Sequence, residues 1–215
     1  MDREFWLQKW RNNQTGFHEK DANPNLTAHF PSLNLQANQR VFIPLCGKTL
    51  DISWLISRGY DVIGAELSDI AIKQLFEQLD VSPQTTQIGH ITRYESHGVT
   101  IFGGDIFHLT GDIIGPIHAI YDRAALVALP PAMRITYTQQ LIAMTGYAPQ
   151  LLVTFDYDQA VMNGPPFSVP KDEVLEHYQD HYHLTCLDTH PINLKGKVPA
   201  QEQVWLLTPS QKIGG

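Results

Sequence analysis

The sequence is poor in cysteine, in clusters of positive charge and in long apolar runs. Cys46 and Cys186 are the only cysteines among 215 residues, too few for the disulfide framework of a small secreted domain. The formal net charge is −7 and no run of lysines and arginines occurs, which argues against nucleic acid and anionic membranes as partners. No apolar run approaches the ~20 residues that span a bilayer, and the N-terminus lacks the apolar core and cleavage site of a signal peptide. We therefore expect a soluble, cytoplasmic protein.

An alternation of strands and helices runs through the chain, which has neither an internal repeat nor a linker, so residues 1–215 are predicted to form a single domain. Strands are predicted over 40–45, 60–67, 98–105, 117–129, 149–158, 182–189 and 202–209. Helices are predicted over 51–59, after the N-cap residue Ser68, from Pro130 to Gly146, and from Pro170. This order predicts an α/β, doubly wound, mainly parallel seven-stranded sheet, with helices on both faces and an antiparallel C-terminal edge hairpin.

The turn after the first predicted strand, "PLCGK", contains one glycine where a dinucleotide site needs three. Gly47 allows a sharp turn and a close approach of ligand to backbone. Leu45, Cys46 and Lys48 have side chains where such a site has glycines, and these side chains would crowd a pyrophosphate. The turn therefore favours a smaller ligand. An ordinary strand-to-helix turn is the alternative.

Acidic residues end the next two predicted strands. Glu66 is spaced to accept hydrogen bonds from both ribose hydroxyls of a nucleoside, and Asp105 follows Gly103 and Gly104 where an adenine amino group would need an acceptor. Each could instead be a solvated strand-end acid or a turn residue. Taken together with the glycine-poor turn, they predict S-adenosylmethionine as the ligand.

The sequence closely resembles the thiopurine S-methyltransferase family, most closely its bacterial members. The resemblance rests on "FWLQKW", "TGFHE", "PLCGK", "GAELS", "YDRAALVAL" and "GPPFSVP", which occur in this order over nearly the whole chain. It implies a class I, Rossmann-like methyltransferase that converts S-adenosylmethionine to S-adenosylhomocysteine and methylates aromatic and heterocyclic thiols, including thiopurines. The cofactor contacts that the resemblance implies are Trp10, Leu45, Glu66 and Arg123, with Asp105 and Ile106 near the adenine, while Phe17 faces the substrate.

Physical arguments also support roles for two of these residues. Trp10 lies on a predicted aromatic helix, and residues 1–35 are predicted to form an N-terminal lid and substrate segment. An aromatic lid excludes water and attracts a sulfonium, although core packing is the alternative. Arg123 could clamp the cofactor carboxylate or steer an anionic acceptor, or it could form a surface ion pair with Asp122.

The acceptor side is predicted from fewer signals. Phe167 follows two prolines in "NGPPFSVP", which forms either one wall of an apolar slot or a rigid connector. Asp21, Asp156 and Asp158 are candidate polar contacts, and no general base is assigned. No metal is predicted, because His177 and His181 are typical of surface residues on a helix, with no zinc motif around them. Cys46 is not expected to act as a nucleophile.

The predicted function is S-methylation of a small-molecule aromatic thiol by a monomeric enzyme. Acidic thiols ionise readily, so alignment in a dry pocket would suffice for transfer. Three alternatives remain open at this point: a nicotinamide-dependent oxidoreductase, a non-catalytic binder of S-adenosylmethionine or of a small molecule, and a methyltransferase acting on selenium or tellurium oxyanions for detoxification.

Overall fold

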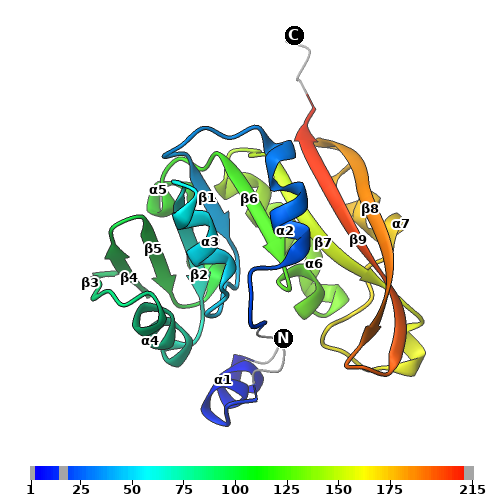
Figure 1. The fold of residues 1–215 in the computed structure, drawn as a ribbon, viewed down its shortest axis with the longest axis horizontal. Helices are drawn as coiled ribbons and strands as arrows, with labels where there is room; N and C mark the ends of the chain where they lie inside the picture. The colour runs from blue at the N-terminus through cyan, green and yellow to red at the C-terminus, as the bar shows by residue number, and fades with distance from the viewer. Residues whose placement is uncertain (1–2, 15–18, 211–215) are drawn as a thin grey trace.

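One mixed sheet organises the computed structural model, which describes residues 3–14 and 19–210. Its order is β3-β4-β5-β2-β1-β6-β7-β9-β8, and the strands from β5 to β7 in that order are parallel (Figure 1). The strands described are β1 (Arg40–Ile43), β2 (Asp61–Glu66), β3 (Gln84–Ile88), β4 (Ile91–Ser96), β5 (Val99–Gly103), β6 (Ala119–Arg123), β7 (Gln150–Asp156), β8 (Tyr182–Leu194) and β9 (Val198–Pro209). The parallel centre is therefore flanked by antiparallel strands at both edges.

Helices cover both faces of the sheet, as the sequence predicts. Side chains of α2 (Pro24–His29), η1 (Phe30–Leu33), α3 (Asp51–Ser57) and α4 (Asp69–Gln78) form one apolar cluster with the sheet. Side chains of η2 (Ile106–His108), α5 (Gly111–Ile114), η3 (Leu126–Ala128), α6 (Pro131–Met144) and α7 (Lys171–Tyr178) form the other. The remaining elements are α1 (Arg3–Arg11) and η4 (Gln159–Val161).

The helix boundaries follow from local chemistry. Ser68 caps α4 by accepting a hydrogen bond from the backbone N–H of Ala71 at 3.3 Å. Pro131 begins α6, where the missing N–H costs nothing, and Gly146 follows its end with a φ of +63°. Tyr137 and Leu141 lie four positions apart on α6 and are both buried.

The seven predicted strands are present, and the structure adds two more. Strands β3 and β4 form a hairpin that extends the sheet beyond β5, so the sheet has nine strands in the described part of the chain rather than seven. The sequence did not predict them because β3, "QTTQI", is almost wholly exposed and therefore has no apolar run. The fourth predicted strand was too long, since β6 ends at Arg123 and Ala124 takes a left-handed φ of +63°.

The N-terminal segment contains more structure than predicted. Helix α2 and the turn η1 follow the predicted α1, and Leu26, Phe30 and Leu33 bury their side chains against the sheet. Thus residues 24–33 belong to the core of the domain, while α1 lies beyond the sheet, toward the end at which the arrow of β6 points (Figure 1). No helix within the described ranges has the length and apolarity needed to cross a membrane.

Close packing at the centre of the sheet yields the first prediction. A Cβ atom at Gly64 would lie 2.6 Å from Cδ1 of Ile101 and 2.8 Å from Sγ of Cys46. Gly64→Ala should therefore lower the free energy of unfolding by about 1–3 kcal/mol through overpacking. Denaturant titration measures this loss, and adding Ile101→Val should recover part of it by removing Cδ1. If the double variant instead shows the sum of the two single losses, overpacking against Ile101 is not the cause.

Candidate functional site

The predicted cofactor turn connects β1 to α3. It contains Leu45, whose φ of +47° is left-handed although the residue is not glycine. The backbone N–H of Cys46 donates to the carbonyl oxygen of Ala65 on β2 at 2.9 Å. Gly47 then reverses the chain with a φ of +54°. The turn is thus tied to β2, next to the residue that ends that strand.

Glu66 ends β2 and is hydrogen-bonded through both carboxylate oxygens. Its Oε2 accepts from the backbone N–H of Gly47 and its Oε1 from that of Ser68, both at 2.7 Å. Only 6% of the residue is exposed, so Glu66 is not the solvated acid of the alternative interpretation. Burial raises the pKa of this carboxyl to about 6, and the backbone N–H groups partly oppose that rise. Each oxygen keeps a lone pair for a further donor.

Trp10 lies directly on this turn. Although α1 is outside the sheet, Trp10 is only 5% exposed. Its ring atoms Cζ2 and Cη2 lie 3.2 and 3.6 Å from where a Cβ of Gly47 would stand. The glycine therefore serves two needs, a left-handed φ and room for the indole. The structure brings Trp10, Gly47 and Glu66 together.

Asp105 and Ile106 lie at the end of the neighbouring strand β5. The backbone N–H of Gly104 donates to the carbonyl oxygen of Glu66 at 2.9 Å, which holds the ends of β5 and β2 together. Asp105 caps η2 by accepting from the N–H of Phe107 at 3.0 Å, and Ile106 is 6% exposed within the core. Asp105 therefore has a local structural role and is partly open to solvent.

Arg123 ends β6, the strand on the other side of β1. Its side chain is 15% exposed and forms an ion pair with Glu19, a partner that the sequence did not identify. Asp122 does not pair with it. Asp122 is buried, accepts hydrogen bonds from the hydroxyl of Tyr137 at 2.7 Å and the N–H of Leu126 at 3.1 Å, and has a pKa that burial raises to about 6.

Phe167 is held close to the segment that follows Arg123. Its backbone N–H donates to the carbonyl oxygen of Val127 at 2.6 Å. The guanidinium carbon of Arg134 lies 5.6 Å from the ring centroid, and Arg134 itself is 1% exposed. This buried arginine, which the sequence analysis missed, also donates to the carbonyl oxygen of Ser168 at 3.2 Å. Phe17, the other predicted acceptor residue, lies outside the described residues.

The candidate aspartates have different environments. Asp156 lines a hollow of about 460 Å³ together with residues 191–193 and 199–201 near the tip of the β8–β9 hairpin. Asp158 caps η4 by accepting from the N–H of Ala160 at 3.0 Å, and Asp21 is exposed. A larger hollow of about 730 Å³ lies between α4 and the β3–β4 hairpin, and no predicted site residue lines it. Of these two hollows, the one at Asp156 lies at the end of β7, the parallel strand beside β6.

The histidine pair is not helical as predicted. Helix α7 ends at Tyr178, so His177 and His181 do not share a helix, and His177 lies 3.3 Å from Glu173 instead. Among the residues described, no group of three or more metal-ligating side chains gathers. Cys46 is buried, which raises the pKa of its thiol well above the ordinary value, and the nearby carboxylate of Glu66 raises it further. Its nucleophilic thiolate is thereby disfavoured.

Comparison with known proteins assigns the chain to a family. A family model described as thiopurine S-methyltransferase matches residues 1–207. The chain belongs to the thiopurine S-methyltransferase family. A relative from Xanthobacter autotrophicus bearing the family name is 51% identical over 210 residues, covering 96% of this chain and 99% of the relative. Another from Teredinibacter turnerae is 47% identical, covering 97% of this chain and 98% of the relative.

Solved structures are similar to this chain in fold. A SAM-dependent methyltransferase from Anabaena variabilis aligns with a TM-score of 0.63 at 14% identity, over 94% of this chain and 93% of that one. The 1,6-didemethyltoxoflavin-N1-methyltransferase of Burkholderia thailandensis, solved with S-adenosylhomocysteine, aligns with a TM-score of 0.62 over 96% of this chain and 87% of that one, also at 14% identity. As a member of the thiopurine S-methyltransferase family with this Rossmann-like fold, the protein is an S-adenosylmethionine-dependent methyltransferase.

The geometry of Glu66 predicts how cofactor binding depends on pH. Ribose hydroxyls donate to the ionised carboxylate, so affinity for S-adenosylmethionine should fall as the pH drops through about 6, where Glu66 takes up a proton. Glu66→Gln should weaken binding by roughly 1.5–3 kcal/mol and flatten this pH dependence. Calorimetric titration at several pH values measures both effects. Asp122→Asn is the control, since Asp122 has the same raised pKa but bonds Tyr137. A Glu66 variant with unchanged affinity would remove the ribose assignment.

The contact between Trp10 and Gly47 predicts an optical signal. Binding of S-adenosylmethionine or S-adenosylhomocysteine should change the tryptophan fluorescence, because the indole lies on the turn where the cofactor is expected. Trp10→Phe should remove most of this change, whereas Trp54→Phe, which alters a half-buried residue of α3, should preserve it. A full response in the Trp10 variant would place the cofactor elsewhere.

Proposed function

We propose that this methyltransferase methylates the sulfur of aromatic and heterocyclic thiols, thiopurines among them. The observation that carries the proposal is Arg123, a mostly buried guanidinium at the end of β6, one strand from the cofactor turn. A cation in this position favours a thiolate over the neutral thiol. The family name of the relatives, thiopurine S-methyltransferase, supports the same acceptor class.

The residues at the strand ends fit S-adenosylmethionine. Glu66 has free lone pairs on both oxygens, and Gly47 and Leu45 turn the backbone beside it. In this proposal Trp10 covers the cofactor, and Asp105 and Ile106 border its adenine. Arg123 lies at the boundary between cofactor and acceptor. When bound, the cofactor supplies a methyl group that its sulfonium already activates.

The protein then has to hold the acceptor sulfur, ionised and aligned, in a dry site. Aromatic thiols are more acidic than aliphatic ones, so a neighbouring guanidinium can keep them ionised near neutral pH without a dedicated base. The nearby buried carboxylates already have partners, Glu66 in the turn and Asp122 on Tyr137. Alignment of reacting groups can supply several kcal/mol of the barrier by itself.

The acceptor ring is proposed to lie over the β6–β7 half of the sheet. The hollow at Asp156, about 460 Å³, has the size of a small-molecule site and lies at the end of β7. Phe17 and Phe167 are the proposed aromatic walls, which would bind planar rings by area and stacking. Of the predicted lid segment, residues 1–35, the part from α2 onward is packed in the core. We further propose that the part before α2 covers this site and that the enzyme works as a cytoplasmic monomer.

A screen of acceptors tests the proposal. S-adenosylhomocysteine release would be followed with thiophenol, a thiopurine, small aliphatic thiols, selenite and tellurite. Aromatic and heterocyclic thiols should exceed aliphatic thiols in kcat/KM by at least about tenfold, or ~1.4 kcal/mol, because the latter lose stacking and carry less thiolate.

The other outcomes separate the remaining alternatives. Turnover with selenite or tellurite alone would favour chalcogen oxyanions, which Arg123 would also attract. Cofactor binding without release of S-adenosylhomocysteine from any acceptor would favour a binding protein. Equal rates with aliphatic and aromatic thiols would contradict the aromatic slot.

A further inference from the structure

We propose that Glu19 is a positioning residue that orients Arg123 toward the methyl acceptor, an inference that builds on the proposed thiol methylation. Glu19 Oε1 pairs with Nη2 of Arg123, and the two residues are 104 positions apart in the chain. The arginine side chain is 15% exposed and the glutamate side chain 39%. The pair thus joins the N-terminal segment to the end of β6, with the cation on the buried side.

Glu19 is itself held by a buried side chain. Nδ2 of Asn23 lies 3.4 and 3.2 Å from the two oxygens of Glu19, and Asn23 is 3% exposed. The backbone N–H of Asn23 donates to Oδ1 of Asp51 at 2.7 Å, and Asp51 is 1% exposed. Asp51 begins α3, just after the cofactor turn. Asn23 therefore links the position of Glu19 to the position of that turn.

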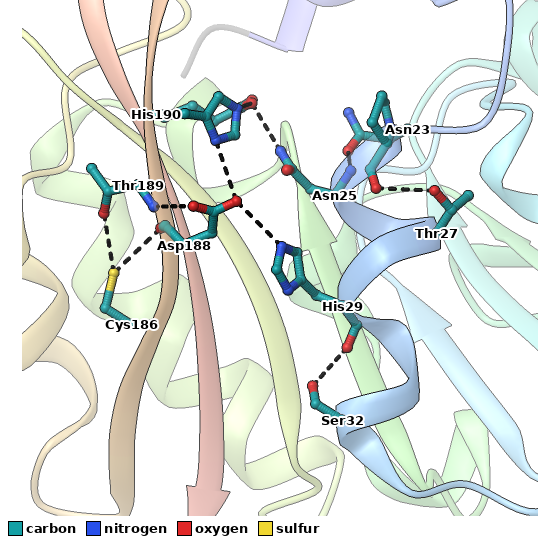
Figure 2. A network of polar contacts seen from close by, with 11 residues as sticks. Asn23, Asn25, Thr27, His29, Ser32, Cys186, Asp188, Thr189 and His190 are labelled. Carbon is teal, nitrogen blue, oxygen red and sulfur yellow. Dashed lines mark hydrogen bonds and ion pairs between the residues drawn. The ribbon is translucent and has the colours of Figure 1, made fainter.

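Helix α2, which Asn23 caps, is seated on the C-terminal hairpin. Figure 2 shows Asn25 and His29 of α2 pointing toward β8, where Asp188 and His190 lie. Nδ2 of Asn25 donates to Oε2 of Glu202 at 2.8 Å, and the same oxygen lies 2.9 Å from Nε2 of His190. His29 and His190 approach Oδ2 of Asp188 at 3.5 and 3.7 Å. These contacts fix α2, and therefore Asn23, to the sheet from a second side.

Orientation matters because an arginine side chain has many rotamers and a planar head. A guanidinium held at one nitrogen presents its other N–H groups in fixed directions. Nε of Arg123 is buried and has no hydrogen-bond partner among the described residues, so its N–H is available to donate to a bound acceptor. An acceptor thiolate that meets this donor is held in place, and a misplacement of about 1 Å can cost about 100-fold in rate.

Glu19 also carries a charge that opposes that of Arg123. Tyr121 lies in the same buried corner: burial raises the pKa of its hydroxyl, the charges of Asp51 and Glu19 raise it further, and that of Arg123 lowers it. If screening outweighed orientation, Glu19 would weaken the effect of Arg123 on the thiolate. The two effects have opposite signs, so removal of Glu19 distinguishes them.

The decisive measurement is the pKa of an aromatic thiol bound in the complex with S-adenosylhomocysteine, read from thiolate absorbance. This complex cannot turn over, so the titration reports the site rather than catalysis. In Glu19→Ala the pKa of the bound thiol should rise by about one unit, since the guanidinium is no longer aimed at sulfur. At neutral pH kcat should fall about tenfold or more, while the Kd for S-adenosylhomocysteine stays within about twofold.

Companion variants identify the route of the effect. Glu19→Gln keeps an oxygen that accepts from Arg123 and should recover part of kcat. In an Arg123→Met background, Glu19→Ala should have little further effect, because Glu19 acts through the arginine. The matched control is Glu95→Ala, which breaks another partly exposed ion pair with an arginine, Arg93–Glu95 at 3.3 Å on β4. It should leave kcat and the thiol pKa unchanged.

Several results would overturn the inference. A lower thiol pKa or a higher kcat in Glu19→Ala would mean that Glu19 screens Arg123. Parallel losses of thermal stability and cofactor affinity would indicate a purely structural role, and a full additional loss in the Arg123→Met background would show independent action. A wild-type enzyme that methylates no thiol would overturn the proposed function and this inference with it. Normal wild-type turnover with an unaltered Glu19→Ala variant would overturn this inference alone.

Discussion

The carboxylate of Glu66 is the constraint on which the site depends. One oxygen holds the turn after β1 and the other holds the start of α4, so a single buried anion joins two consecutive strand-to-helix connections. Burying this charged carboxylate costs free energy of desolvation, and the two backbone N–H groups that donate to it offset part of that cost. Since Trp10 rests on the same turn, the position of α1 also depends on it.

The parallel centre of the sheet could be predicted because strands that are buried on both faces have short, continuous apolar sequences. "RVFI" and "DVIGAE" are buried almost throughout, and the helix that follows "DVIGAE" has a clear N-cap residue, Ser68. The β3–β4 hairpin could not be predicted in this way, because its hydrogen bonds hold polar, exposed residues at an edge. Its formation depends on the edge of β5, which no local pattern reveals.

The candidate site shows the same division. Gly47 and Glu66 could be predicted because strand ends and turn glycines are local signals, and the structure brings them into contact. Glu19 could not be predicted, because the role proposed for it depends on its contact with Arg123. Arg123 is distant in sequence, and the two residues are neighbours only in the folded sheet. Arg134 was missed for a related reason. It lies within a helix pattern, and only the packing of the 164–168 loop reveals that its charge is buried beneath Phe167.

The contact between Asn25 and Glu202 spans 177 positions of sequence. During synthesis, the parallel strands that carry the turn and Glu66 emerge long before β9 does. The polar side chains of α2, Asn25 and His29, therefore gain their partners Glu202 and Asp188 only when the C-terminal hairpin has paired with β7. The contacts that hold α2 are therefore completed only once β9 is in place, and a chain shortened before β9 would retain the cofactor turn but lose the partner of Asn25.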